Sequence, residues 1–215
     1  SVLIQEHIKP IFVDISDKDF NLDPIDVQRK ITKNTKALII VHLYGQPANM
    51  DKLIQIARKN KLVLIEDCAQ AVGAKYKSKF VGSFGDISCF SFYQTKHLVT
   101  GEGGMILTNN ENYANVLRSI FNNGIKRSNL EDYDFDRIGF NYQITEMQAA
   151  LAVSQLKKLD NLNYIRRKNT KIYKKLLAKT DIQFQKEDIN TINVYCYLTG
   201  LLPERLKNKR DLFIN

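Results

Sequence analysis

One stretch near the start of the chain constrains the fold most, because it alternates strand and helix patterns with short connections. Residues 37–43 (ALIIVHL) and 62–65 (LVLI) are continuous apolar runs, which are typical of strands buried on both faces of a sheet. Between them, the apolar residues of 49–60 recur at helical spacing, and Asn49 is placed to cap that helix. A strand–helix–strand unit of this kind predicts an α/β fold with a parallel sheet flanked by helices.

The same alternation continues along the chain. We expect strands at 87–92 and 104–108, a helix at about 111–122, a polar surface loop over 126–142, a helix from Thr145 to about Lys179 with a break near Asp160, a strand at 193–201 and a short helix at 203–208. The first residues, SVLIQ, also have an apolar strand pattern. Because the chain begins and ends inside such patterns, we expect it to be a fragment of a longer protein.

The composition is that of an ordinary globular protein, with 44% hydrophobic and 26% charged residues. No apolar run approaches the ~20 residues of a membrane span, and no signal peptide is visible. Cys68, Cys89 and Cys196 are widely spaced, which argues against a disulfide framework or a zinc site and fits a reducing cytosol. The formal charge of +9 suits an anionic ligand.

Four polar side chains follow the ends of two predicted strands, where α/β sheets place their ligands. Asp67 and Gln70 come after the strand at 62–65. Ser91 ends the next strand, and Lys96 lies in the loop that follows it, ahead of a GEGG turn. Each residue alone has an ordinary interpretation, such as a helix cap, a buried hydroxyl or a surface lysine. Their order and their shared position at strand ends indicate a joint site.

This set of groups matches what pyridoxal phosphate needs from a protein. A lysine holds the aldehyde as a Schiff base, and a carboxylate keeps the pyridine nitrogen protonated. Hydroxyl and backbone N–H groups bind the phosphate, and a side-chain amide can hold the ring hydroxyl. The chain supplies these parts as Lys96, Asp67, Ser91 and Gln70. Once free, the lysine can also act as the base that moves the substrate proton.

Three long segments resemble the DegT/DnrJ/StrS-type nucleotide-sugar aminotransferases, a fold-type-I pyridoxal-phosphate family. They are VHLYGQPANMD (41–51), IEDCAQAVGAKYKSKFVGSFGDISCFSFYQTKHLVTGEGG (65–104) and GFNYQITEMQAALAVSQLKKLD (139–160). Weaker similarity covers nearly all the rest of the chain. The resemblance implies the large domain of a fold-type-I transferase, with a mostly parallel sheet, followed by the start of a smaller C-terminal α/β domain.

The resemblance also implies domain boundaries. Residues 1–155 would form the cofactor-binding large domain, 156–180 a connecting helix and 181–215 the start of the small domain. Both domains would be truncated. In the family, a glycine–threonine turn for the phosphate and an aromatic residue that stacks on the cofactor ring lie upstream of the point that corresponds to Ser1.

Roles for the four strand-end residues follow from the same resemblance. Lys96 would be the catalytic lysine that forms the imine with the cofactor. Asp67 would pair with the pyridinium nitrogen, and Gln70 would contact the ring hydroxyl. Ser91 would bind the phosphate.

Partners and reaction are implied as well. Asn141 of GFNYQ would reach the phosphate of the cofactor in a partner subunit, so we expect a homodimer with shared active sites. His42 and Tyr44 would lie near the pocket, and no metal is expected. The implied cytoplasmic reaction moves an amino group, from glutamate, to a keto group of a nucleotide-linked sugar. Such products serve cell-surface polysaccharides or secondary metabolites.

Other functions stay open at this point. Sugar dehydratases of the same fold carry histidine in place of the lysine, so Lys96 favours amino transfer over dehydration. A truncated, non-catalytic homologue is the second alternative. A nucleic-acid-binding module is the third, but the basic residues form no stripe interleaved with exposed aromatic side chains.

Overall fold

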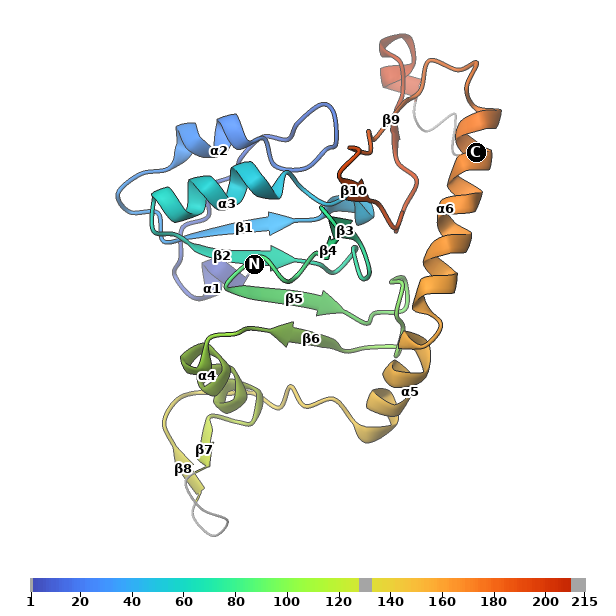
Figure 1. Ribbon diagram of the computed structural model, residues 1–215. Coiled ribbons are helices and arrows are strands. Elements are labelled where there is room, and N and C mark those ends of the chain that lie inside the picture. The colour runs from blue at the N-terminus through green and yellow to red at the C-terminus, as the bar shows by residue number, and fades with distance from the viewer. Residues whose placement is uncertain (1, 128–132, 210–215) are drawn as a thin grey trace.

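The computed structural model describes residues 2–127 and 133–209 of the chain, and its centre is a four-stranded sheet (Figure 1). The strand order is β1-β2-β5-β6, and the bounds are Ala37–Val41, Val63–Asp67, Ile87–Ser91 and Gly104–Leu107. The first three strands are parallel and β6 is antiparallel to β5. The expected mostly parallel α/β sheet is therefore confirmed.

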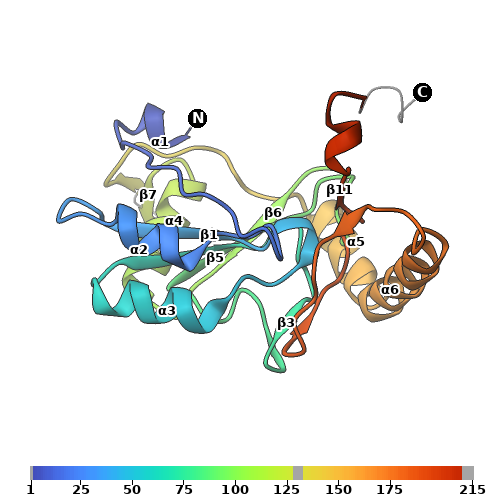
Figure 2. The ribbon, with the colours of Figure 1, turned by 90° about the horizontal axis from the view of Figure 1, so that it is seen from above.

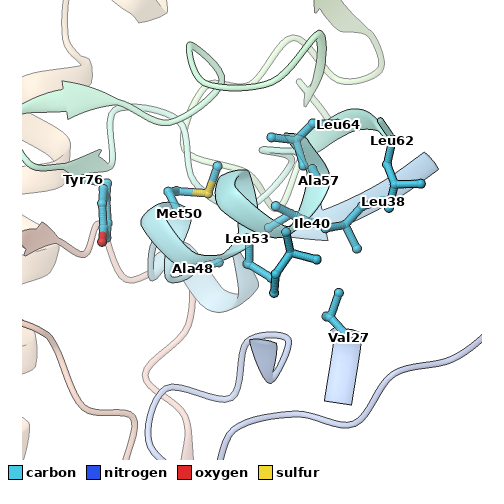
Figure 3. Close-up of a cluster of buried hydrophobic side chains, with 11 residues drawn as sticks. Val27, Leu38, Ile40, Ala48, Met50, Leu53, Ala57, Leu62, Leu64 and Tyr76 are labelled. Atoms are coloured by element: carbon cyan, nitrogen blue, oxygen red, sulfur yellow. The ribbon is translucent and has the colours of Figure 1, made fainter. Parts of the chain in front are cut away.

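Helices α2 (Pro24–Lys30) and α3 (Met50–Lys59) pack on one face of β1 and β2. Asn49 caps α3 as predicted, because its Oδ1 accepts the N–H of Lys52. Figure 3 shows the core that results, in which side chains from both helices and both strands interdigitate. Its buried members include Val27, Leu38, Ile40, Met50, Leu53 and Leu64.

The other face of β1 is more open. Ile39, between the buried Leu38 and Ile40, is 39% exposed. The prediction that this strand is buried on both faces is therefore wrong, because α2 and α3 cover only one of them. On the opposite side of the sheet from α3 lies α4 (Glu111–Phe121), which follows β6 (Figure 2).

Residues 126–142 contain more structure than the expected loop. Strands β7 (Ile125–Arg127) and β8 (Tyr133–Phe135) pair as an antiparallel hairpin. The long helix predicted after this region is two helices, α5 (Glu146–Leu156) and α6 (Leu159–Leu176). The break near Asp160 is confirmed, at residues 157–158. Thr145 is the N-cap of α5 and forms a capping box with Gln148.

Helix α6 lies across the carboxyl ends of the parallel strands, and both ribbon views agree on this position (Figures 1 and 2). Asn163 of α6 donates from Nδ2 to the carbonyl of Val72 over 3.1 Å. Gly73 leaves room for this contact, since a Cβ there would lie 2.6 Å from Nδ2 of Asn163. The helix is therefore fixed against the loop that follows β2.

After α6 the chain returns toward the sheet. The strands here are short: β9 Gln183–Phe184, β10 Thr191–Ile192 and β11 Gly200–Leu201, followed by the 3₁₀ helix η2, Glu204–Lys209. Strand β10 joins β3 (Lys75–Tyr76) and β4 (Lys79–Phe80) in a three-stranded sheet. The strand predicted at 193–201 is wrong over residues 193–199, because residues 193–197 instead pack on the 3₁₀ turn η1, Leu43–Gly45. Only Gly200 and Leu201 are in a strand, β11. The domain boundaries stay a prediction.

The N-terminal strand pattern is also wrong. Residues Val2–Gln5 form a short helix, α1, in which Glu6 N–H donates to the Val2 carbonyl over 3.0 Å. None of these apolar side chains is buried, so no sheet neighbour stabilises an extended chain there. Among the described residues, no helix has both the length and the apolar content needed to cross a membrane.

Candidate active site

The predicted strand-end residues meet at one edge of the sheet. Asp67 is the last residue of β2 and Ser91 the last of β5. Because these strands are parallel, their carboxyl ends lie on the same side (Figure 1). Gly104, where β6 begins, pairs with Ser91, so the loop that carries Lys96 leaves and re-enters the sheet at this edge.

The Lys96 loop is closed by its own backbone. Phe92 N–H donates to the Gly103 carbonyl and Thr100 N–H to the Phe92 carbonyl, each over 2.9 Å. Lys96 N–H donates to Tyr93 over 2.9 Å, and the lysine side chain is half-buried. Within residues 2–127 and 133–209, no carboxylate forms an ion pair with Lys96. A lysine fixed at a strand-end turn without a counter-ion is available to a ligand.

Asp67 presents one free carboxylate oxygen. Its Oδ1 accepts the N–H of Ala69 over 2.9 Å, which fixes the side chain in the turn after β2. No described residue donates to Oδ2. Cys89 is the strand partner of Asp67, and burial, together with the nearby Asp67 charge, raises the pKa of the Cys89 thiol. The half-buried Asp67 therefore has a neutral neighbour and an unused acceptor.

Gln70 is oriented by the backbone of the η1 turn. Tyr44 N–H donates to Oε1 of Gln70 over 2.7 Å. Because the amide oxygen is used, the Nε2 end of the side chain remains as a donor. Tyr44 adopts a φ of 61°, in the left-handed region that few non-glycine residues occupy, and this conformation aims its N–H at Gln70.

Ser91 is half-buried at the end of β5, and its Oγ accepts the N–H of Tyr93 over 3.3 Å. The hydroxyl proton is not needed for that bond and can be donated to an anion. The four side chains thus offer a carboxylate oxygen, amide N–H groups, a hydroxyl and an amine. These are the groups that a ring N–H, a ring oxygen, a phosphate and an aldehyde require, so the residues present fit pyridoxal phosphate.

Asn141 is not brought to these four residues within the chain. It is exposed and lies beyond β8, where it pairs with Asn122 at the end of α4. Gly139 allows this arrangement, since a Cβ there would lie 2.0 Å from the backbone N of Gly124. The expected role of Asn141 toward a partner subunit remains a prediction.

His42 lies beside Asp67, since its backbone N–H donates to the Asp67 carbonyl over 3.1 Å, but its side chain makes a separate buried contact. It is fully buried; its Nε2 lies 3.0 Å from Oε2 of Glu66, and its Nδ1 accepts the N–H of Ala48 over 3.1 Å. This tautomer, assigned from the contacts, makes Nε2 the donor. Sequence reasoning missed the pair because His42 follows β1 while Glu66 lies in β2, and no motif spacing links them.

Glu66 is buried and accepts further N–H donors from the loop after β4. Gly82 donates to Oε2 over 2.8 Å, and Phe84 and Gly85 donate to Oε1 over 2.8 and 2.6 Å. Burial alone would raise the pKa of Glu66, but the His42 hydrogen bond and these N–H groups outweigh it and hold the pKa below its usual value.

A metal is not required to explain this cluster. His42, Glu66 and Cys68 bring ligand-type atoms within 4.8 Å of one another. Both ring nitrogens of His42 and both oxygens of Glu66 are already hydrogen-bonded, however. Burial, together with the carboxylates of Glu66 and Asp67, raises the pKa of the Cys68 thiol. We therefore assign the cluster to the support of the β1 and β2 ends.

A hollow of about 420 Å³ lies elsewhere, between residues 82–85, β6 and α4. None of the four strand-end residues lines it. The candidate site is instead the edge of the sheet itself, between the turn after β2, the Lys96 loop and residues 193–197.

The chain is similar to known proteins over its whole length. The sequence profile of the DegT/DnrJ/EryC1/StrS aminotransferase family matches residues 1–215. GDP-perosamine synthase of Escherichia coli O157:H7 is 37% identical over 203 residues, which are 94% of this chain and 55% of that protein. The chain therefore spans about half the length of this curated relative.

Two solved structures share the fold. Helicobacter pylori PseC, an aminotransferase involved in the biosynthesis of pseudoaminic acid, superposes with a TM-score of 0.92 at 25% identity, over 98% of this chain and 57% of PseC. The GDP-4-keto-6-deoxymannose-3-dehydratase ColD, with bound GDP-perosamine, has a TM-score of 0.87 at 28% identity, over 94% of this chain and 56% of ColD. The likeness thus includes both amino transfer and dehydration.

Proposed function

This chain belongs to the DegT/DnrJ/EryC1/StrS aminotransferase family, and we propose that it carries the cofactor site of an enzyme that aminates a keto group of a nucleotide-linked sugar. The family implies a pyridoxal phosphate cofactor. We propose glutamate as the amino donor and the cytoplasm as the place of the reaction. The similarity to GDP-perosamine synthase supports a nucleotide-sugar substrate.

The arrangement at the carboxyl edge of the sheet carries this proposal. Asp67 and Ser91 end neighbouring parallel strands, and Lys96 lies in the closed loop between them and β6. Each keeps one functional atom without a partner among the described residues. These side chains are half-buried, so their unpaired polar atoms remain open to a ligand at the edge of the sheet.

Each residue has a distinct task in this proposal. Oδ2 of Asp67 would hold the ring N–H, Nε2 of Gln70 would donate to the ring oxygen, and Oγ of Ser91 would donate to the phosphate. Nζ of Lys96 would hold the aldehyde and, when released, would act as the base that moves the proton from the substrate carbon to a carbon of the cofactor. When bound, pyridoxal phosphate supplies an electron sink for the charge left by that proton.

A second subunit belongs to the proposal. Asn141 is exposed and outside the set that this chain assembles. Helix α5, just after it, is apolar yet contains no buried residue, and such faces mark interfaces. We therefore propose a homodimer in which Asn141 contributes to the phosphate site of the partner subunit.

The decisive experiment locates the cofactor on the chain. Protein incubated with pyridoxal phosphate is reduced with borohydride, digested and analysed by mass spectrometry. The added mass is expected on the peptide that contains Lys96, to be absent in Lys96→Ala, and to persist in Lys79→Ala, which removes an exposed lysine. Attachment at another lysine only, or at none, would refute the assignment.

Dehydration is the second candidate, because ColD shares the fold. The two reactions differ in their products. The protein would be incubated with a 4-keto nucleotide sugar and glutamate. An amino sugar as the product supports transamination, whereas a keto sugar that has lost a hydroxyl group and gained no nitrogen supports dehydration.

A further inference from the structure

Residues 193–197, called here the 193–197 segment, lie between the η1 turn, which orients Gln70, and the loop that carries Lys96. On one side the segment pairs with the η1 turn. Val194 N–H donates to the Gly45 carbonyl over 3.1 Å, and Cys196 N–H donates to the Tyr44 carbonyl over 2.8 Å. These two bonds make the turn and the segment one backbone unit.

Gly45 allows the η1 turn and the 193–197 segment to approach each other closely. Its φ is 98°, and a Cβ there would lie 2.8 Å from the backbone N of Tyr195. Tyr44, whose carbonyl receives Cys196, uses its own N–H for Gln70. The orientation of Gln70 therefore depends on a turn that the 193–197 segment supports.

On its other side the segment contacts the Lys96 loop through His97. Nε2 of His97 lies 3.2 Å from the Val194 carbonyl oxygen, and the residue is only 3% exposed. A carbonyl can only accept, so Nε2 carries the hydrogen. Among the described residues, this is the one side-chain hydrogen bond from residues 94–99 that leaves the loop.

The 193–197 segment is itself held by α6 and by the chain before it. Arg167 of α6 donates to the Asn193 carbonyl and lies 2.6 Å from Glu187. Glu187 accepts Asn193 N–H over 2.9 Å and the Tyr195 hydroxyl over 2.8 Å. These contacts hold the 193–197 segment in place, and a movement of the chain after α6 would therefore move the segment as well.

The unpaired Nδ1 of His97 indicates that the ring is neutral when Nε2 donates its hydrogen bond. Nδ1 is buried and has no partner. Burial, together with the positive charges of Lys96 and Arg166, lowers the pKa of His97 to about 4. A second ring proton would have no acceptor, so a single, directional N–H to Val194 is the stable state at neutral pH.

Resting on the proposed function, we propose that His97 is a positioning residue for Lys96: its hydrogen bond to the Val194 carbonyl ties the lysine loop to the 193–197 segment. His97 does not touch the reacting atoms. Through the segment, Lys96 and Gln70 share one support, so the amine and the amide that face the cofactor keep a fixed spacing.

The test compares three variants in the whole protein. His97→Ala removes the contact, His97→Gln keeps an N–H at about the reach of Nε2, and Leu98→Ala removes volume from a buried neighbour without touching the hydrogen bond. Hydrogen exchange of the Val194 and Cys196 amides is measured without cofactor. The pH midpoint of the visible absorbance is then measured with pyridoxal phosphate bound.

We expect exchange at both amides to rise about tenfold in His97→Ala, and the absorbance midpoint to shift. Both values should return toward wild type in His97→Gln and stay near wild type in Leu98→Ala. If His97→Ala fails to fold, His97→Asn replaces it, because its amide is too short to reach Val194. Unchanged exchange in these variants, or equal changes in Leu98→Ala, would overturn the proposal.

The two halves of the experiment separate this proposal from the proposed function. Exchange reports the contact between His97 and the 193–197 segment whether or not a cofactor binds. A wild-type protein that never acquires the cofactor absorbance would count against the proposed function alone.

Discussion

The backbone N–H of Tyr44 donates to Oε1 of Gln70 over 2.7 Å, and this bond decides which end of the Gln70 amide faces the candidate site. The N–H belongs to a residue with a φ of 61°, so the turn carries a conformation that its sequence does not favour. The carbonyl of the same residue receives Cys196 N–H. The donor end of Gln70 is therefore set by contacts on both sides of one peptide turn.

Gln70→Glu should separate these two ends. The carboxylate still accepts Tyr44 N–H, but it has no N–H for the cofactor and adds a negative charge beside the ring oxygen. Loss of a hydrogen bond to a charged group costs about 1.5–3 kcal/mol, so we expect cofactor affinity to fall about 10- to 100-fold. Fluorescence titration with pyridoxal phosphate measures it.

Gln55→Glu is the control for Gln70→Glu, because Gln55 is an exposed residue of α3. It makes the same chemical change away from the sheet edge, and its affinity should stay that of the wild type. Equal affinities in the two variants would remove Gln70 from the site.

Glu66→Gln should destabilise the fold without removing a strand-end residue of the site. The buried carboxylate accepts four N–H donors, including that of His42. An amide at this position must aim its own N–H₂ at groups that are also donors. Turning the His42 tautomer round would only move the conflict to Ala48 N–H.

The cost of such a buried mismatch is about 2–4 kcal/mol. Urea unfolding at neutral pH measures it for Glu66→Gln. Glu146→Gln, at the exposed first residue of α5, should cost less than about 0.5 kcal/mol. A Glu66→Gln protein as stable as this control would show that the four N–H contacts contribute little.

Gly45→Ala and Gly101→Ala form a matched pair. Both glycines have a positive φ, 98° and 87°, but only Gly45 is crowded: a Cβ there lies 2.8 Å from Tyr195 N, whereas nothing lies within 4 Å at Gly101. Gly101→Ala should cost the conformational term alone, about 1 kcal/mol. Gly45→Ala should cost about 2 kcal/mol more, as measured by denaturant unfolding. Equal losses of stability in the two variants would mean that the 193–197 segment moves away from the added Cβ at no cost.

The local features of the site could be predicted from the sequence because each depends only on residues that are close together in the chain. Asn49 caps its helix, and Asp67 and Ser91 end parallel strands, which follows from the apolar pattern and the chain direction alone. The resemblance added their roles. Neither approach needed a contact between distant segments.

What the sequence did not predict depends on such distant contacts. His97 and Val194 are 97 residues apart, and His42, just after β1, is 24 residues from Glu66 of β2. No periodicity or capping rule joins these pairs. Residues 193–201 were predicted to form a strand because their apolar pattern suits one, but Val194 and Cys196 use their N–H groups on the η1 turn instead. Tertiary packing overrides the local preference there.

Because His97 is buried in the folded protein, the free energy of unfolding should fall as the pH is lowered. Its pKa is lowered from 6.5 to about 4, mainly by burial and further by the positive charges of Lys96 and Arg166. The unfolded chain therefore binds the proton first as the pH falls. The stability that His97 contributes is complete above pH 6.5 and is lost progressively down to about pH 4. A shift of this size corresponds to at most about 3 kcal/mol.

Comparing wild type with His97→Gln isolates this contribution, because the other titrating groups are common to both proteins and cancel in the difference. The free energy of unfolding is measured by urea at several pH values between 7.5 and 4.5. We expect the wild type to lose more stability than His97→Gln across this range, by about 2–3 kcal/mol. His7→Gln, at an exposed histidine, should follow the wild-type curve. Parallel curves for wild type and His97→Gln would mean that the protonated ring finds an acceptor, and that the neutral N–H to Val194 is not the only stable form of this contact.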